Sequence, residues 1–253
     1  MITAERDLWM SDYDNGFRLY KKALIEMNIG NDDIQTNGEA NLLKMLSTDH
    51  TEGVIFDVGA NVGEYTECLY QTFGDERKIF SFEPSSKSFD ELCKHSVNRE
   101  WVLPHQIAFS DESGTAILYS DKEKSKLASL YKRHLESINI DMNRQEEVYV
   151  DTIDEFCDNY IFKIFLLKLD VEGNELKVLK GAKRMIEMGN IKNIQFEFGG
   201  CNIDSRIFFR DFWEMLSDKY DFYRIMPDRL VLITAYSELF EIFTSQNFFL
   251  KLK

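Results

Sequence analysis

The chain has 253 residues, 44% of them hydrophobic and 29% charged, a composition that suits one large α/β domain with a helical lead-in. Thirty basic against 44 acidic residues give a net charge of −14, which repels a phosphate backbone and argues against a nucleic-acid partner. Residues 1–16 lack the apolar core of a signal peptide, and no apolar run is long enough to span a bilayer, so we expect a cytoplasmic protein.

The first fifty residues are predicted to form helices that cap the rest of the chain. Apolar residues recur at helical spacing from Phe17 to Ile25, and polar residues at 31–38 interrupt the pattern. From Gly53 onward, short apolar runs alternate with amphipathic stretches, which is typical of βαβ units and of a mostly parallel sheet. We therefore expect a helical cap over residues 1–50 and an α/β domain over residues 51–253.

Within this domain the apolar runs predict strands, and the amphipathic stretches between them predict helices. The predicted strands are residues 54–58, 79–82, 102–103, 164–169, 191–198, 222–225, 230–234 and 248–252. The predicted helices are residues 63–73, 85–97, 175–188 and 207–216. The alternation lapses between residues 111 and 150, where an edge-like run at 115–119 precedes a basic stretch with serines at 122–133. We expect a mobile insertion around 120–147, which is either a lid beside the active site or a solvated surface loop.

The sharpest local pattern is residues 57–66 (DVGANVGEYT), where a buried strand runs directly into a glycine turn and a helix. Gly59 and Gly63 allow a ligand to approach the backbone closely, and the start of the helix offers free N–H groups. Asn61 replaces the second glycine of the dinucleotide pattern, and Asp57 ends the strand. A carboxylate there repels a pyrophosphate but suits the ammonium and sulfonium groups of S-adenosylmethionine. The alternative is an ordinary strand-turn-helix corner.

A second strand, residues 79–84 (IFSFEP), ends in the carboxylate of Glu83 about twenty residues further on. A carboxylate at this spacing is placed to accept hydrogen bonds from the ribose of an adenosine-containing ligand. NAD uses the same arrangement, so a nicotinamide-dependent oxidoreductase is an alternative. The glycine spacing and Asp57 argue against that alternative.

A third buried strand leads into residues 166–176 (LLKLDVEGNEL), where three carboxylates cluster. Glu175 suits the start of a helix, whose dipole favours negative charge. Asp170 and Glu172 follow the strand directly, at the end where open α/β sheets place their chemistry.

Taken together, residues 57–63 (DVGANVG), 82–84 (FEP) and 168–175 (KLDVEGNE) resemble the FkbM family of S-adenosylmethionine-dependent methyltransferases. The resemblance covers residues 38–198 and, more weakly, residues 247–253. It implies a Rossmann-like class I methyltransferase fold, with a mostly parallel seven-stranded sheet and helices on both faces. It also implies that Asp57, Gly59, Asn61 and Gly63 line the methionine portion of the cofactor, with Glu83 at the ribose. The rest of the predicted cofactor site is Tyr65, Thr66 and Pro84 and, near the adenine, Ala108, Ser110 and Asp111.

The same resemblance implies O-methylation of a hydroxyl on a sugar, glycan or polyketide-type natural product. Such a reaction needs a group that takes or weakens the hydroxyl proton, for which Asp170, Glu172 and Lys168 are the local candidates. Glu197 ends the strand expected beside that of Asp170, so these two carboxylates are candidates for holding Mg²⁺ at the acceptor oxygen. Their alternative role is to bind cofactor or acceptor directly. A methyltransferase-like binding module without catalysis is the non-enzymatic alternative.

Four aromatic residues late in the chain are candidates for pairing subunits into a homo-oligomer or for lining an acceptor groove. Their helical spacing favours ordinary core packing instead. They are Phe208, Phe209, Phe212 and Trp213.

Overall fold

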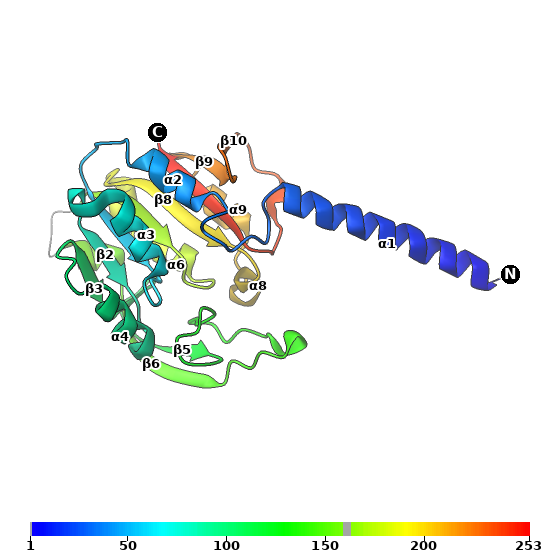
Figure 1. Cartoon of the computed structure of the whole chain (residues 1–253), viewed down its shortest axis with the longest axis horizontal. Helices are drawn as coiled ribbons and strands as arrows, with labels where there is room; N and C mark the ends of the chain where they lie inside the picture. The colour runs from blue at the N-terminus through cyan, green and yellow to red at the C-terminus, as the bar shows by residue number, and fades with distance from the viewer. Residues whose placement is uncertain (1, 159–162) are drawn as a thin grey trace.

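A computed structural model describes residues 2–158 and 163–253, with side chains from residue 13 onward. The described part of the chain is built on an eight-stranded sheet in the order β10-β9-β11-β8-β7-β1-β2-β3 (Figure 1). Its strands are β1 (Val54–Val58), β2 (Ile79–Phe82), β3 (Val102–His105), β7 (Ile164–Leu169), β8 (Ile191–Phe198), β9 (Tyr220–Ile225), β10 (Leu230–Ile233) and β11 (Gln246–Leu252).

The central strands β8, β7, β1, β2 and β3 pair in parallel, which confirms the predicted Rossmann-like α/β arrangement. The sheet is mixed at its other edge, where β11, β9 and β10 pair antiparallel. The sheet has eight strands among the described residues, one more than the seven that the family resemblance implies. The run predicted as a strand at 230–234 pairs with β9 as β10, after a tight turn closed by Met226 N–H and the Arg229 carbonyl. β3 also extends through Pro104, which an edge strand tolerates.

Helices cover both faces of this sheet, as the alternation of side chains along its strands requires. Ile55 packs with α2 (Glu39–Leu46) and α3 (Glu64–Phe73) in one hydrophobic cluster. Its neighbour Phe56 packs in a second cluster on the opposite face, which includes residues of four further helices. These are α5 (Ile153–Asp158), α6 (Glu175–Lys180), α7 (Lys183–Glu187) and α9 (Phe209–Leu216).

The remaining described helices are α1 (Ile2–Glu26), α4 (Ser86–His95) and α8 (Cys201–Ser205), with single 3₁₀ turns at Gly74–Glu76, Glu136–Ile138 and Glu238–Phe240. α2 packs on the sheet, whereas α1 extends away from it (Figure 1). The division into a cap over residues 1–50 and a domain over residues 51–253 stays a prediction. Among the described residues, no helix combines the length and apolar character needed to cross a membrane.

The helix predicted over residues 175–188 is broken into α6 and α7. The cause is the close approach of Gly181 to another loop, because a Cβ atom on Gly181 would lie 2.0 Å from the carbonyl oxygen of Ser110. The Gly181 carbonyl then accepts the backbone N–H of Asp154. The backbone at Gly181 therefore packs against the segments of Ser110 and Asp154 instead of continuing the helix.

Residues 108–151 form a second, three-stranded sheet in the order β4-β6-β5, which includes the edge-like run predicted at 115–119 and the insertion predicted around 120–147. Its strands are β4 (Ala108–Phe109), β5 (Gly114–Ser120) and β6 (Arg144–Asp151). The sequence pattern misses β6, since its side chains are mostly polar and only Val148 and Val150 are buried hydrophobics. The connection from 121 to 143 joins two paired strands, and its mobility stays a prediction.

The late aromatic residues pack mainly inward, as their helical spacing predicts. Phe209 and Phe212 are fully buried, and Trp213 packs against the same core. Phe208 is the exception, with half of its surface exposed.

Candidate active site

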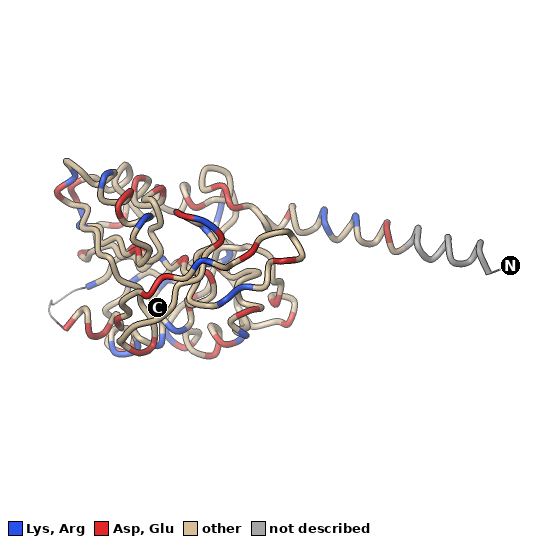
Figure 2. Tube along the Cα trace, turned by 90° about the horizontal axis from the view of Figure 1, so that it is seen from below, with Lys and Arg blue, Asp and Glu red and all other residues tan. Residues whose placement is uncertain are grey.

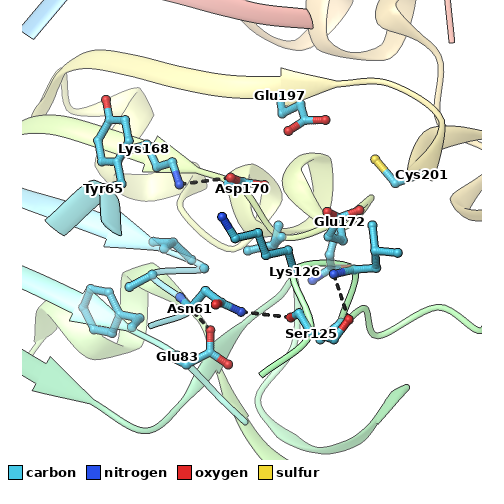
Figure 3. Close-up of a pocket in the computed structure, with 18 of the residues that line it drawn as sticks. Asn61, Tyr65, Glu83, Ser125, Lys126, Lys168, Asp170, Glu172, Glu197 and Cys201 are labelled. Carbon is cyan, nitrogen blue, oxygen red and sulfur yellow. Dashed lines mark hydrogen bonds and ion pairs between the residues drawn. The ribbon is translucent and has the colours of Figure 1, made fainter. Parts of the chain in front are cut away.

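A cavity of about 410 Å³ opens at the carboxyl ends of β1, β2, β7 and β8. The chain leaves β1 toward β2 on one side of the sheet and later returns to β7 on the other, and open α/β sheets bind ligands where the strand order reverses in this way. Ten of the predicted site residues line the cavity (Figure 3). They are Gly59, Asn61, Tyr65, Glu83, Pro84, Ala108, Lys168, Asp170, Glu172 and Glu197, of which Figure 3 labels all except Gly59, Pro84 and Ala108.

The glycine turn after β1 forms one wall of the cavity. Gly59 has a φ of +83°, and a Cβ atom there would lie 1.8 Å from the carbonyl oxygen of Asp170. Only glycine therefore allows β1 and β7 to end this close together. Gly63 does not line the cavity; it lets the start of α3 approach Leu92 of α4.

Glu83 presents a nearly buried carboxylate at the end of β2. It accepts hydrogen bonds from the backbone N–H groups of Asn61 (2.9 Å) and Ser85 (2.8 Å), which fix its orientation at the cavity wall. Burial raises the pKa of Glu83 to about 7, although the two N–H donors oppose the shift. The carboxylate can still accept hydrogen bonds from a ligand, as the ribose prediction requires.

Asp57 and Thr66 lie beneath the cavity and do not line it. The Thr66 hydroxyl donates to the Asp57 carboxylate at 2.6 Å, and the Lys168 ammonium lies 3.6 Å from the other oxygen of Asp57. Lys168 also lies 3.2 Å from the Asp170 carboxylate, which faces the cavity. Burial alone would lower the pKa of Lys168, but the carboxylates of Asp170 and Asp57 outweigh burial and raise it.

A buried hydrogen-bonded chain ties the N-terminal segment to this site. The Tyr65 hydroxyl donates to Gln195 at 2.6 Å, and the Gln195 amide donates to Glu39 at 2.5 Å. Asn37 holds the second oxygen of Glu39 at 2.7 Å. Glu39 and Asn37 line the cavity, and the sequence pattern did not identify them because no local motif marks either residue.

The opposite wall of the cavity is acidic. Glu172, with a φ of +52°, forms an ion pair with Arg133 from the insertion. Burial and the nearby charge of Asp170 raise the pKa of Glu172 to about 8, and Arg133 opposes the shift. The carboxylate of Glu197 has neither a hydrogen bond nor an ion pair within the described residues. Burial, together with the charges of Asp170 and Glu172, raises the pKa of Glu197 well above its ordinary value.

Part of the insertion forms the outer wall of the cavity through residues 125–130. The Ser125 carbonyl accepts the side-chain amide of Asn61 at 2.9 Å (Figure 3). The Lys126 ammonium lies 2.7 Å from the carboxylate of Glu64 at the start of α3. The insertion therefore contacts the same turn that carries the predicted cofactor residues.

Two predicted cofactor residues lie elsewhere. Ser110 and Asp111 line a separate cavity of about 270 Å³, where Asp111 lies 3.9 Å from the Lys177 ammonium. Ala108, from the same segment, does line the main cavity. Of Ala108, Ser110 and Asp111, which are predicted near the adenine, only Ala108 therefore lies at the main cavity.

The carboxylates predicted to hold magnesium, Asp170 and Glu197, face the same cavity, but Asp170 is paired with Lys168. Among the described residues, no group of three or more His, Cys, Asp or Glu side chains is arranged to hold a metal ion. Divalent hard cations need about six oxygen ligands, so the magnesium prediction gains no support from this geometry.

A model of the family described as "Methyltransferase FkbM domain" matches residues 57–223. The chain is 28% identical over 167 residues to the hexuronic acid methyltransferase AglP of Haloferax volcanii, covering 64% of each protein. It is 24% identical over 146 residues to Methyltransferase 1 of Beauveria bassiana, covering 51% of this chain and 58% of that protein. A crystal structure of Methyltransferase FkbM from Methylobacillus flagellatus KT aligns with 16% identity and a TM-score of 0.47, over 78% of this chain and 43% of that one. The chain spans about three fifths of the length of these two curated relatives.

Proposed function

The chain belongs to the FkbM methyltransferase family, and we propose that it transfers a methyl group from S-adenosylmethionine to a hydroxyl of a sugar, glycan or natural-product acceptor. The observation that carries the proposal is that Gly59 and Glu83 line the same cavity. The turn at Gly59 has no room for a Cβ atom. The buried carboxylate of Glu83 is held beside it by two backbone N–H groups. The cavity volume falls within the range of about 300–1,000 Å³ that is common for small-molecule sites.

We propose that Glu83 accepts hydrogen bonds from the ribose and that Gly59 and Asn61 admit the methionine portion beside Asp170, which is paired with the buried Lys168. When bound, S-adenosylmethionine supplies an electrophilic methyl group on a positively charged sulfur. The negative charge of Asp170, whose side chain is 40% exposed, is available to stabilise that positive charge. Lys168 fixes the orientation of Asp170 from below.

Glu197 is the proposed proton acceptor for the acceptor hydroxyl. The other two carboxylates at this wall are already paired, Asp170 with Lys168 and Glu172 with Arg133. Glu197 faces the cavity without a partner among the described residues, and a carboxylate with a raised pKa is a stronger base once ionised. This arrangement supports Glu197 over the sequence-based candidates Asp170, Glu172 and Lys168.

The charges of the cavity favour an uncharged or amino-bearing acceptor. Each lining cation already has a carboxylate partner, in the pairs Lys126–Glu64, Arg133–Glu172 and Lys168–Asp170. Glu197 and Asp32 line the cavity without a side-chain partner in the described chain. A carboxylate on the acceptor would find no unpaired cation here, and its negative charge would oppose the ionisation that Glu197 needs as the proton acceptor. We therefore expect an acceptor different from the hexuronic acid in the name of the archaeal relative.

Calorimetric titration with S-adenosylhomocysteine tests the cofactor part of the proposal. We expect micromolar binding to the unmodified chain, weaker binding to Glu83→Ala, and no binding of NAD. Glu76→Ala is the matched control, because Glu76 is an exposed acid outside the cavity. An absence of binding to the unmodified chain would remove the basis for the proposed reaction.

A further inference from the structure

The helix α1 carries an apolar stripe that no described residue outside α1 covers. Side chains 13–23 are all exposed, and α1 extends away from the sheet (Figure 1). Tyr13, Phe17 and Tyr20 lie on one face, with successive ring centroids 6.3 and 6.4 Å apart. Their exposed fractions are 73%, 46% and 48%. A single helix in water gains most of its stability from packing of such a face, so this stripe needs a partner.

The spacing of the stripe is that of a coiled coil. Tyr13, Phe17, Tyr20 and Leu24 follow one another at intervals of four, three and four residues. This repeat of about 3.5 residues places them at successive a and d positions of a heptad, which form the contact line between two helices. Leu19 and Ile25 are also exposed but lie off this line.

The two flanks of the stripe differ from each other. At about 100° per residue, Asp14 and Lys21 fall on one flank, at the two e positions. Gly16 and Ala23 fall on the other flank, at the g positions, and nothing lies within 4 Å of a Cβ atom built on Gly16. Figure 2 shows the basic residues of α1 between two acidic positions, one toward its N-terminal end and one toward the body of the molecule. The e flank therefore carries two opposite charges, and the g flank carries two small residues.

This asymmetry distinguishes the two ways in which two copies of α1 can pair. In a parallel pair, e positions face g positions, so Asp14 and Lys21 would face small residues and form no ion pair. In an antiparallel pair, e positions face e positions, and Asp14 of each copy meets Lys21 of the other. The small residues then face one another on the second flank, where they allow the helices to approach closely. Charge complementarity therefore selects the antiparallel arrangement.

We propose that α1 forms an antiparallel coiled coil with α1 of a second copy of this chain, with Tyr13, Phe17, Tyr20 and Leu24 in the shared seam and two symmetric Asp14–Lys21 ion pairs on one flank. The dimer holds the two cavities apart at opposite ends of the paired helices. The inference is independent of the proposed methyl transfer.

Sedimentation velocity of the full chain over a range of concentrations tests this proposal. We expect a dimer for the unmodified chain and a monomer for Phe17→Glu. Asp14→Lys and Lys21→Asp should each weaken dimerisation by about tenfold or more, since each replaces two attractions with two repulsions. The double variant Asp14→Lys/Lys21→Asp should regain the original affinity to within about threefold, because the pairs are restored with reversed sign. Lys22→Asp makes the same charge change on the outer face and should have little effect.

Three results would overturn the proposal. They are a monomeric unmodified chain, a dimer that survives Phe17→Glu, and a double variant no better than the single ones. A monomer that sediments with phosphatidylglycerol vesicles in a Phe17-dependent way would assign the stripe to a lipid surface instead. Near-ultraviolet circular dichroism of each variant checks that the sheet is intact, since residues 13–23 are exposed and do not support it.

Discussion

Asp57 and Lys168 face each other in the register of β1 and β7, and their charged groups lie 3.6 Å apart under the cavity floor. Both side chains are buried, and one Asp57 oxygen has no hydrogen-bond partner. An ion pair of this kind is costly to break from one side, because the remaining charge stays buried without compensation.

Lys168→Met should therefore lower the free energy of unfolding by about 3–5 kcal/mol, as measured by urea denaturation. Lys192→Met is the matched control. Lys192 lies 2.7 Å from Asp49 with about a quarter of each side chain exposed, so its loss should cost about 1 kcal/mol or less. If both variants lose the same free energy of unfolding, Lys168 does not compensate a buried charge on Asp57.

The strands of this region were predictable because they are continuous apolar runs. Ile164–Leu169 is buried at every position, and a run of that kind between turn signals predicts a strand in a parallel sheet. The carboxylates Glu83, Asp170 and Glu197 were predictable for the same reason, since each lies within one residue of the end of such a run. Their convergence follows from parallel strands alone.

Other parts of the site were not predictable, because their contacts join residues far apart in the sequence. The Gln195–Glu39 hydrogen bond spans 156 positions, and neither residue belongs to a local motif. Arg133 reaches Glu172 from a segment whose basic residues otherwise indicate a solvated loop. The antiparallel edge also depends on the turn at 226–229, which the apolar pattern does not determine.

The affinity for S-adenosylhomocysteine should rise as the pH passes through the pKa of Glu83, which is raised by burial to about 7. The sign follows from the charge of the carboxylate. Ionised Glu83 accepts hydrogen bonds with both oxygens, whereas protonated Glu83 loses part of that capacity. Calorimetry between pH 6 and pH 8, values of about one unit on either side of the pKa, measures the effect.

Glu83→Gln is the variant that isolates this titration. It keeps the shape of the side chain but cannot ionise, so we expect about tenfold weaker binding at the higher pH and a flatter pH profile. An unchanged pH profile in Glu83→Gln would assign the dependence to another group, such as the amine of the ligand.

Glu197→Gln should lower kcat by about 10²–10⁴-fold in a methyl-transfer assay, because the variant lacks the proposed proton acceptor. Affinity for S-adenosylhomocysteine should stay within about threefold of that of the unmodified chain. Since the pKa of Glu197 is raised above its ordinary value, kcat of the unmodified chain should increase with pH as the ionised fraction grows.

Two comparisons make this result specific. Glu147→Gln changes an exposed acid on β6 outside the cavity and should leave kcat unchanged. Asp170→Asn is the competing variant: if it abolishes turnover while Glu197→Gln retains it, the proton acceptor is Asp170.

The insertion should become resistant to trypsin between Lys122 and Arg144 when S-adenosylhomocysteine binds. The reason is the contact of the Ser125 carbonyl with Asn61, which joins the insertion to the proposed cofactor turn. A second contact, Lys124 to Glu91 at 2.7 Å, holds the insertion to α4 outside the cavity. Glu91→Gln should therefore speed cleavage at Lys124 in the free protein but leave ligand affinity intact.

Cleavage at Arg229, in the turn at 226–229, provides an internal reference, because this exposed residue lies outside the cavity. Protection confined to residues 122–144 would mean that the ligand orders the insertion, as a lid requires. Equal protection at both places would instead reflect a general effect on the protein or the protease. No protection at either place would mean that the insertion is a fixed wall, whose contacts with Asn61 and Glu91 persist without ligand. Such a wall would shape the acceptor site without closing over it.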